Sequence, residues 1–116
     1  NSCNTLVLFS GATIANTTFD NGACDQVSSG GQILLYSGSV LITESLFRNN
    51  SVHQGTGGAI QMKPQGKSEL HVFNSRFELN SASGGGGAIA TTGAAAIVEL
   101  RNSTFLNNSA HAPLFP

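Results

Sequence analysis

Short stretches in which apolar residues alternate with more polar ones recur along this chain at nearly constant intervals. Alternation with a period of two is typical of β-strands that bury one face. The inward positions of the first kind of stretch are Ala12 and Ile14, Val40 and Ile42, Leu70 and Val72, and Val98 and Leu100. The second kind places inward Ile33 and Leu35, Ile60 and Met62, Ile89 and Thr91, with Thr5 and Val7 aligned in the first copy. No segment carries the apolar spacing and capping residues of a helix, so the chain is predicted to be all-β.

Two short motifs alternate along the same stretches. Phe-x-x-Asn-Ser occurs three times, with its phenylalanine and asparagine at Phe47 and Asn50, Phe77 and Asn80, and Phe105 and Asn108. Gly-Gly-Ala-Ile occurs twice, as Gly57, Gly58, Ala59 and Ile60 and as Gly86, Gly87, Ala88 and Ile89. A degenerate copy precedes both, in which Gly22 stands at the asparagine position and Gln32 at the alanine position. Phe19 aligns with the three later phenylalanines at intervals of 28, 30 and 28 residues, so one structural unit recurs about four times.

A unit of 27 to 30 residues with two or three short strands and glycine corners fits one rung of a parallel β-helix. Neighbouring rungs pair in parallel because equivalent residues recur in the same chain direction. A hairpin meander is the alternative, but its antiparallel strands do not stack Phe over Phe. The crossover rule makes the helix right-handed. We expect rungs at about residues 1–29, 30–56, 57–85 and 86–116, with a positive-φ corner between the two strands at Gly11, Gly38, Gly66 and Gly93.

Stacking of the rungs predicts columns of identical side chains. The four phenylalanines form one interior column at the strand spacing of about 4.8 Å. Asn50, Asn80 and Asn108 form a second column, in which amides bond along the axis and asparagine accommodates a left-handed bend. A hydroxyl column lies two residues before each phenylalanine, at Thr17, Ser45, Ser75 and Ser103.

Composition narrows the choice of partner. Only 9% of the residues are charged and the net charge is −1, so no basic surface is available for nucleic acid. No stretch has the roughly 20 apolar residues of a membrane span, and no stretch of these residues is expected to be a signal peptide. The chain is expected to be a fragment of a longer array, whose exposed rung ends favour end-to-end self-association unless a segment such as 112–116 covers one of them. Cys3 and Cys24 permit a disulfide in an oxidising compartment.

The alternation of Gly-Gly-Ala-Ile with Phe-x-x-Asn resembles the polymorphic membrane proteins of chlamydiae, over the whole chain. The resemblance implies an autotransporter: a β-helical passenger that a C-terminal β-barrel displays on the bacterial surface. It also implies a role as an adhesin that attaches the bacterium to host cells, with both motifs held responsible. A direct role of the motifs in binding is not expected on physical grounds, because buried Phe and Ile side chains cannot touch a receptor. We therefore expect the motifs to build a scaffold whose outward side chains bind.

Outward positions six and four residues before each phenylalanine give two ladders on one sheet. The first holds Leu41, His71 and Glu99, and the second holds Thr43, Phe73 and Arg101. His71 is expected to pair with Glu99, and Arg101 to lie over the ring of Phe73. The functional interpretation is a patch formed by Leu41, His71, Phe73 and Arg101 that binds a host-cell surface protein or glycan. The alternative is ordinary pairing between neighbouring strands.

The residues do not point to catalysis, a cofactor or a metal. The six carboxylates are scattered over different columns, whereas glycosidic cleavage needs two of them facing one groove. Six residues after each phenylalanine lie Asp25, His53, Ser83 and His111, but the loops there differ in length and no oxyanion hole is evident. The leading hypothesis is a surface adhesin fragment. The alternatives are a structural or self-associating stalk and, less favoured, a carbohydrate-active enzyme.

Overall fold

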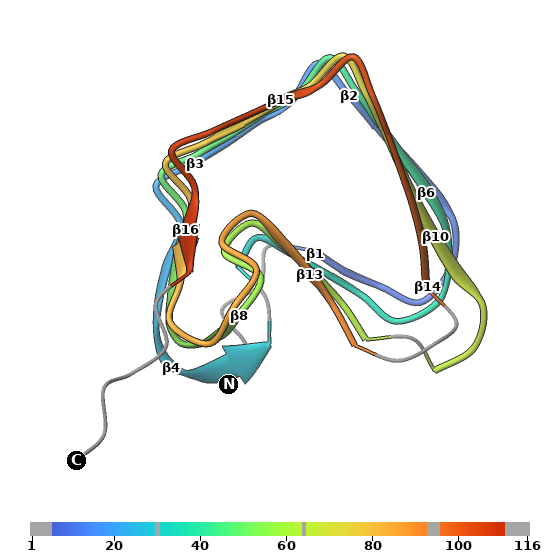
Figure 1. Cartoon of the computed structure of the whole chain (residues 1–116). Coiled ribbons are helices and arrows are strands. Elements are labelled where there is room, and N and C mark those ends of the chain that lie inside the picture. Colours follow the sequence, from blue (N-terminus) through green and yellow to red (C-terminus); the bar gives the residue numbers. More distant parts are fainter. Residues whose placement is uncertain (1–5, 30, 64, 93–95, 111–116) are drawn as a thin grey trace.

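A computed structural model describes residues 6–29, 31–63, 65–92 and 96–110 of the chain. Within these ranges the protein contains sixteen β-strands and no helix. Four strands make one turn of a solenoid, and successive turns nearly superpose when they are viewed along the axis (Figure 1). The predicted parallel β-helix is confirmed, but each turn has four strands instead of two or three.

The strands form four sheets, each with one strand from every turn. Sheet A contains β1 (Leu6–Leu8), β5 (Ile33–Leu35), β9 (Ile60–Met62) and β13 (Ile89–Thr91). Sheet B contains β2 (Ala12–Ala15), β6 (Gly38–Thr43), β10 (Ser68–Phe73) and β14 (Ala96–Arg101). Sheet C contains β3 (Thr18–Asp20), β7 (Leu46–Arg48), β11 (Arg76–Glu78) and β15 (Thr104–Leu106). Sheet D contains β4 (Ala23–Ser29), β8 (Ser51–Thr56), β12 (Ser81–Ala82) and β16 (Ser109–Ala110).

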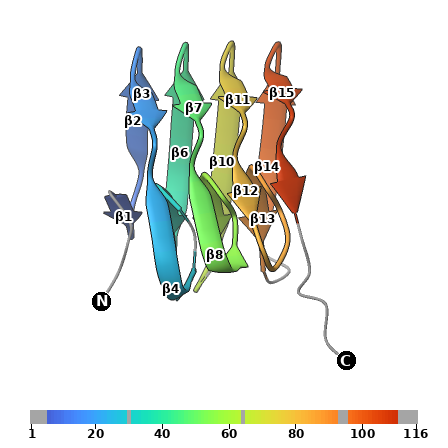
Figure 2. The ribbon, with the colours of Figure 1, turned by 90° about the vertical axis from the view of Figure 1, so that its left-hand side faces the viewer.

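All pairings between these strands are parallel, and they keep equivalent repeat positions opposite one another. Figure 2 shows the four turns side by side along the axis. In Figure 1 the chain runs counter-clockwise from β1 through β2 and β3 to β4, and Figure 2 places the C-terminal turn nearest to the viewer of Figure 1. The solenoid is therefore right-handed, as the crossover rule requires.

The phenylalanine column is the centre of the core. Phe19, Phe47, Phe77 and Phe105 lie opposite one another in sheet C. Successive ring centroids are 4.6, 4.6 and 4.8 Å apart with interplanar angles of at most 5°, within the range of offset-stacked rings. Phe47 and Phe77 are completely buried, whereas Phe105 in the last turn is 40% exposed. Its outer ring face has no further turn above it in the described chain.

Aliphatic columns from sheets A and B complete the core. Val40, Ile42, Leu70 and Val72 are buried, but Val98 and Leu100 at the same positions of the last turn are exposed. The segment 112–116, expected to cover this end, lies outside the described residues. In the first turn the expected inward position Val7 is wrong, because this side chain is 40% exposed, and Thr5 lies outside the described residues. Leu6 and Leu8 pair with Ile33 and Leu35 and pack on the core, because no Gly-Gly marks the register there.

The asparagine column is a continuous ladder of hydrogen bonds. The amide of Asn80 is fully buried, and its Oδ1 accepts bonds from the backbone N–H of Asn50 (3.0 Å) and from Asn50 Nδ2 (2.9 Å). Its Nδ2 donates to the carbonyl oxygen of Phe47 (3.0 Å) and to Oδ1 of Asn108 (2.9 Å). Each amide thus closes the backbone bend of the turn before it. A buried polar column with all its bonds made stabilises one register of stacking.

The left-handed corners lie one residue away from the expected positions. The residue before each position of the asparagine column, which Gly22 occupies in the first unit, has positive φ: Asn21, Asn49, Leu79 and Asn107. A second such corner, between sheets B and C, holds Asn16, Glu44, Asn74 and Asn102. Asparagine suits six of these eight positions because its short side chain tolerates the left-handed region. The expected positive-φ glycines are correct only at Gly38; φ is not positive at Gly11 or Gly66, and Gly93 lies outside the described residues.

The first unit departs from the two motifs at Gly22 and Gln32, and these residues compensate each other in the structure. Gly22 has no side chain to continue the asparagine ladder, and a Cβ built on it would lie 2.1 Å from Nε2 of Gln32. That Nε2 donates to Oδ1 of Asn50 (2.7 Å), beside the bond from the Gly22 backbone N–H (3.0 Å). In the next turn the same two bonds reach Asn80 from a single residue, Asn50. The amide of Gln32 therefore substitutes for the missing asparagine amide.

This exchange predicts a strong coupling between the two positions. Gln32→Ala removes a bond to a buried amide and leaves a cavity, and Gly22→Asn collides with the Gln32 side chain, so each costs about 1 to 2 kcal/mol of unfolding free energy. The double variant restores the motif of the later turns, and its unfolding free energy is expected to lie within about 0.5 kcal/mol of that of the wild type. Urea denaturation of the four proteins measures this. Additive losses in the double variant would contradict the exchange.

Candidate functional site

The outer face of sheet B is a flat surface on which three outward columns run along the axis. Its middle column contains Leu41, His71 and Glu99, and the next contains Thr43, Phe73 and Arg101. The third column adds Ser39, Glu69 and Ile97. The strands of this sheet form the right-hand side of Figure 1. The patch of Leu41, His71, Phe73 and Arg101 therefore lies together on adjacent strands, as the repeat alignment predicts.

His71 sits between two carboxylates. Its Nδ1 lies 2.7 Å from Oε1 of Glu99 on the next strand, and its Nε2 lies 3.1 Å from Oε1 of Glu69 on its own strand. Carboxylates only accept hydrogen bonds, so the protonated imidazolium, which carries hydrogen on both ring nitrogens, is the form that can donate to both of them. The pKa of His71 is accordingly raised, first by the hydrogen bond to Glu99 and then by that to Glu69. The same bonds lower the pKa of Glu99 and of Glu69.

The raised pKa of His71 predicts a pH dependence of stability. A folded-state pKa above the unfolded value of about 6.5 means that the contribution of His71 is complete below pH 6.5 and is lost as the pH rises through the folded pKa. Lys67 and Arg101 contact the same two carboxylates. Urea unfolding free energy is therefore expected to fall between pH 6 and pH 9.

The matched control for this prediction is His71→Leu, which places in this position the residue that Leu41 supplies one strand away. Its unfolding free energy is expected to decline less over the same interval. An NMR titration of the His71 ring gives its pKa directly. A midpoint at or below 6.5, or an equal decline in both proteins, would contradict the assignment.

Phe73 and Arg101 form the apolar and cationic part of the patch. The guanidinium carbon of Arg101 lies 5.8 Å from the centroid of the Phe73 ring, so the predicted contact is present. Nε of Arg101 also donates to Oε2 of Glu99 (2.9 Å), which links it to the His71 cluster. Phe73 and Leu41 are half-buried. They offer apolar area with defined orientation at a low entropic cost of ordering.

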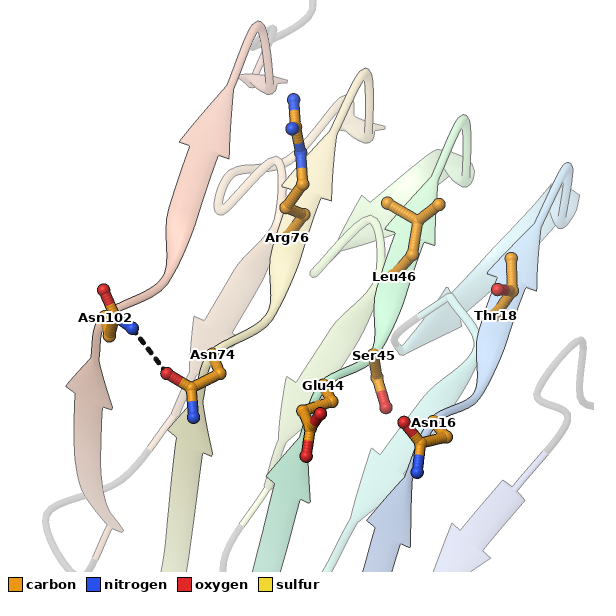
Figure 3. Close-up of a pocket in the computed structure, with 8 residues that line it drawn as sticks. All are labelled: Asn16, Thr18, Glu44, Ser45, Leu46, Asn74, Arg76 and Asn102. Atoms are coloured by element: carbon orange, nitrogen blue, oxygen red, sulfur yellow. Dashed lines mark hydrogen bonds between the residues drawn. The ribbon is translucent and has the colours of Figure 1, made fainter.

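A second surface feature is a groove along the corner between sheets B and C. It is lined by Asn16, Thr18, Glu44, Ser45, Leu46, Asn74, Arg76 and Asn102, shown in Figure 3. These residues come from all four turns, so the groove runs parallel to the axis. None of the binding positions predicted from the sequence lies in this groove. The available signal was the position three residues before each phenylalanine, which reads Asn, Glu, Asn, Asn.

The motif residues lie in the interior. Three motif residues, Gly86, Ile89 and Asn108, are partly exposed, and Phe105 is exposed; all four belong to the last described turns. The other motif residues are buried, namely Phe47, Asn50, Gly57, Gly58, Ala59, Ile60, Phe77, Asn80, Gly87 and Ala88. The side chains of Cys3 and Cys24, and so their disulfide, lie outside the described part of the structure. A bulge between Cys24 and Val27 shifts the register around Asp25, and the side chain of Asp25 is likewise not described.

Over the described ranges, no three histidine, cysteine or acidic side chains are arranged to hold a metal ion. The same ranges include no helix long and apolar enough to cross a membrane.

Comparison with known proteins identifies the repeat. Residues 74–92 match the model of the Chlamydia polymorphic membrane protein repeat. This segment runs from the B–C corner of the third turn through Phe77 and Asn80 to the following Gly-Gly-Ala-Ile. Neither the search of curated proteins nor that of solved structures gave a significant match. The segment holds one copy of each of the two motifs on which the resemblance rests, so this part of the chain is similar to the chlamydial polymorphic membrane protein repeat, here folded as part of a right-handed parallel β-solenoid.

Proposed function

We propose that this chain is part of a bacterial surface adhesin and attaches to host cells through the outer face of sheet B. The family repeat and the solenoid fold fit a passenger fragment of an autotransporter. A passenger of this family belongs at the outer membrane or cell surface, facing outward. Its partner in this proposal is a host-cell surface protein or glycan.

The observation that carries the proposal is that the motif residues lie in the interior, whereas the side chains suited to binding lie on the surface. Phe47, Phe77, Asn50 and Asn80 are completely buried, so they build the scaffold and cannot contact a receptor. Sheet B carries on its outer side an aromatic ring with a guanidinium above it, next to an apolar side chain. Aromatic and arginine side chains are enriched among residues that dominate binding energy at interfaces. Catalysis is not part of the proposal.

The test is competition for attachment. Purified chain is added to host cells together with bacteria that display the full-length protein, and adherent bacteria are counted. The wild-type chain is expected to reduce attachment, and Phe73→Thr with Leu41→Thr is expected to abolish that effect. Both substitutions use residues of the same columns, Thr43 and Thr13, so the fold is preserved. Arg48→Leu, on sheet C, is the control and places there a leucine like Leu106 of its own column.

A second candidate function is a self-associating stalk that spaces other domains from the membrane. Val98, Leu100 and Phe105 leave core columns exposed in the last described turn, and an exposed core column of this kind can stack on a second copy. A stalk predicts association that Phe105→Ser weakens, together with no competition for attachment by the wild-type chain. Competition lost in the Phe73 and Leu41 variant excludes a purely structural role.

A further inference from the structure

The B–C corner groove has one polar wall and one apolar wall (Figure 3). The polar wall is the column of left-handed residues Asn16, Glu44, Asn74 and Asn102, with φ between 49° and 54°. The apolar wall is formed by the Leu46 side chain and the stem of Arg76, whose head group bonds away from the groove to Glu78 at 2.9 Å. Thr18 extends this wall with a hydroxyl.

Much of the hydrogen-bonding capacity of the polar wall is unused within the described chain. Asn102 Nδ2 donates to Asn74 Oδ1 (2.6 Å), which leaves the Asn74 amide nitrogen and the Asn102 oxygen available. The side chains of Asn16 and Glu44 have no hydrogen bond or ion pair with any described residue. Amides offer a donor and an acceptor in one group, and a carboxylate adds strong acceptors.

Glu44 is the residue of this column that the fold does not require. The other three positions are asparagine, which suits the left-handed region, whereas glutamate at a φ of 49° is strained. Its side chain makes no bond that offsets this strain within the described structure. A strained, exposed and unpaired carboxylate in the middle of a groove is a feature typical of binding sites.

We propose that this groove binds a neutral, hydroxyl-rich glycan lying along the solenoid axis. Polar side chains recur along the groove at the strand spacing of about 4.8 Å, so successive sugar units meet successive side chains. Sugar hydroxyls both donate and accept, as the amides do, and the C–H face of a sugar packs on Leu46 and the Arg76 stem. The inference does not depend on the outer face of sheet B or on a role in adhesion.

Two other ligand classes fit the groove less well. An anionic glycan would meet the Glu44 carboxylate, and the Arg76 guanidinium is already paired with Glu78. An extended peptide would need an open strand edge, but the central strands β7 and β11 are paired on both sides. The charge and topology therefore favour an uncharged glycan.

The test is NMR titration of the isotopically labelled chain with cellohexaose, maltohexaose and a poly-N-acetyllactosamine hexasaccharide, and separately with a heparin hexasaccharide. At least one neutral oligosaccharide is expected to shift the backbone signals of Asn16, Glu44 and Asn74 saturably. Glu44→Asn restores the asparagine column and is expected to weaken that binding about tenfold while leaving the unfolding free energy equal or higher. Leu46→Thr, which uses the residue of Thr18, is expected to weaken it as well.

Arg48→Leu, outside the groove on the same sheet, serves as the control and is expected to bind like the wild type. Three results would overturn the inference. They are the absence of a saturable shift with every neutral oligosaccharide, tighter binding of the heparin fragment, and unchanged affinity in both Glu44→Asn and Leu46→Thr. The glycan titration measures binding by the isolated chain, so a negative titration leaves the attachment experiment unaffected. A negative attachment experiment likewise leaves the glycan proposal unaffected.

Discussion

Phe47→Ala is expected to reduce the unfolding free energy by about 3 to 5 kcal/mol. The ring is completely buried and is stacked on both faces, 4.6 Å from the centroids of Phe19 and of Phe77. Removing it leaves a cavity in the middle of the column and takes away two ring contacts, each worth about 0.5 to 1.5 kcal/mol beyond the buried area. In a solenoid each turn contacts only its neighbours, so the loss weakens the interface on both sides of the second turn.

The matched control is Phe105→Ala at the last position of the same column. Phe105 is 40% exposed and is stacked on one described ring, Phe77. Its removal is expected to cost less than half as much. Urea denaturation followed by circular dichroism measures both variants. Equal losses at the two positions, or a loss below about 1 kcal/mol for Phe47→Ala, would show that the column is not the centre of the core.

Gly58→Ala is expected to destabilise the protein by about 3 kcal/mol or more. A Cβ at Gly58 would lie 2.1 Å from the carbonyl oxygen of Gly87 in the next turn and 2.6 Å from that of Ser81. These are backbone atoms, and hydrogen bonds such as that from Gly58 N–H to Gly86 O (3.1 Å) hold the turns together. The clash therefore cannot be relieved by rotating a side chain, and neighbouring turns must separate.

Gly66→Ala is the control for the same chemical change. Gly66 lies on a loop, has no atom within 4 Å of an added Cβ, and does not have positive φ. The substitution is expected to leave stability unchanged or to raise it by up to about 1 kcal/mol, because alanine restricts the unfolded chain. Thermal and urea unfolding distinguish the two variants. A Gly58→Ala protein as stable as Gly66→Ala would refute the close approach of the turns.

The Gly-Gly motif thus has a division of roles that its sequence does not reveal. The first glycine of the pair, Gly57 or Gly86, has positive φ, whereas the second, Gly58 or Gly87, lacks a side chain because the next part of the solenoid lies against it. The first reason is local and the second comes from stacking. The sequence alone does not separate the two.

The outer face of sheet B was largely predictable. Period-two alternation counted back from the phenylalanines placed His71 beside Glu99 and Arg101 over Phe73, and both contacts are present. The bond from His71 to Glu69 was not foreseen, because it joins two outward residues of one strand, whereas the alignment of the repeats predicts pairs between strands. The corner groove was not foreseen either, since a groove depends on the angle between two sheets and not on either strand.

The repeat pattern alone was enough to predict a parallel β-solenoid, the residues that stack and most of the side chains that face outward, because a repeat of nearly constant length places each residue over its own counterpart. Tertiary structure decided what differs between turns. It set the number of strands in a turn and the left-handed corners one residue before the buried asparagines. It also joined Gly22 to Gln32 through the amide of Asn50. These features depend on contacts between residues of different columns, and no periodicity within one column contains that information.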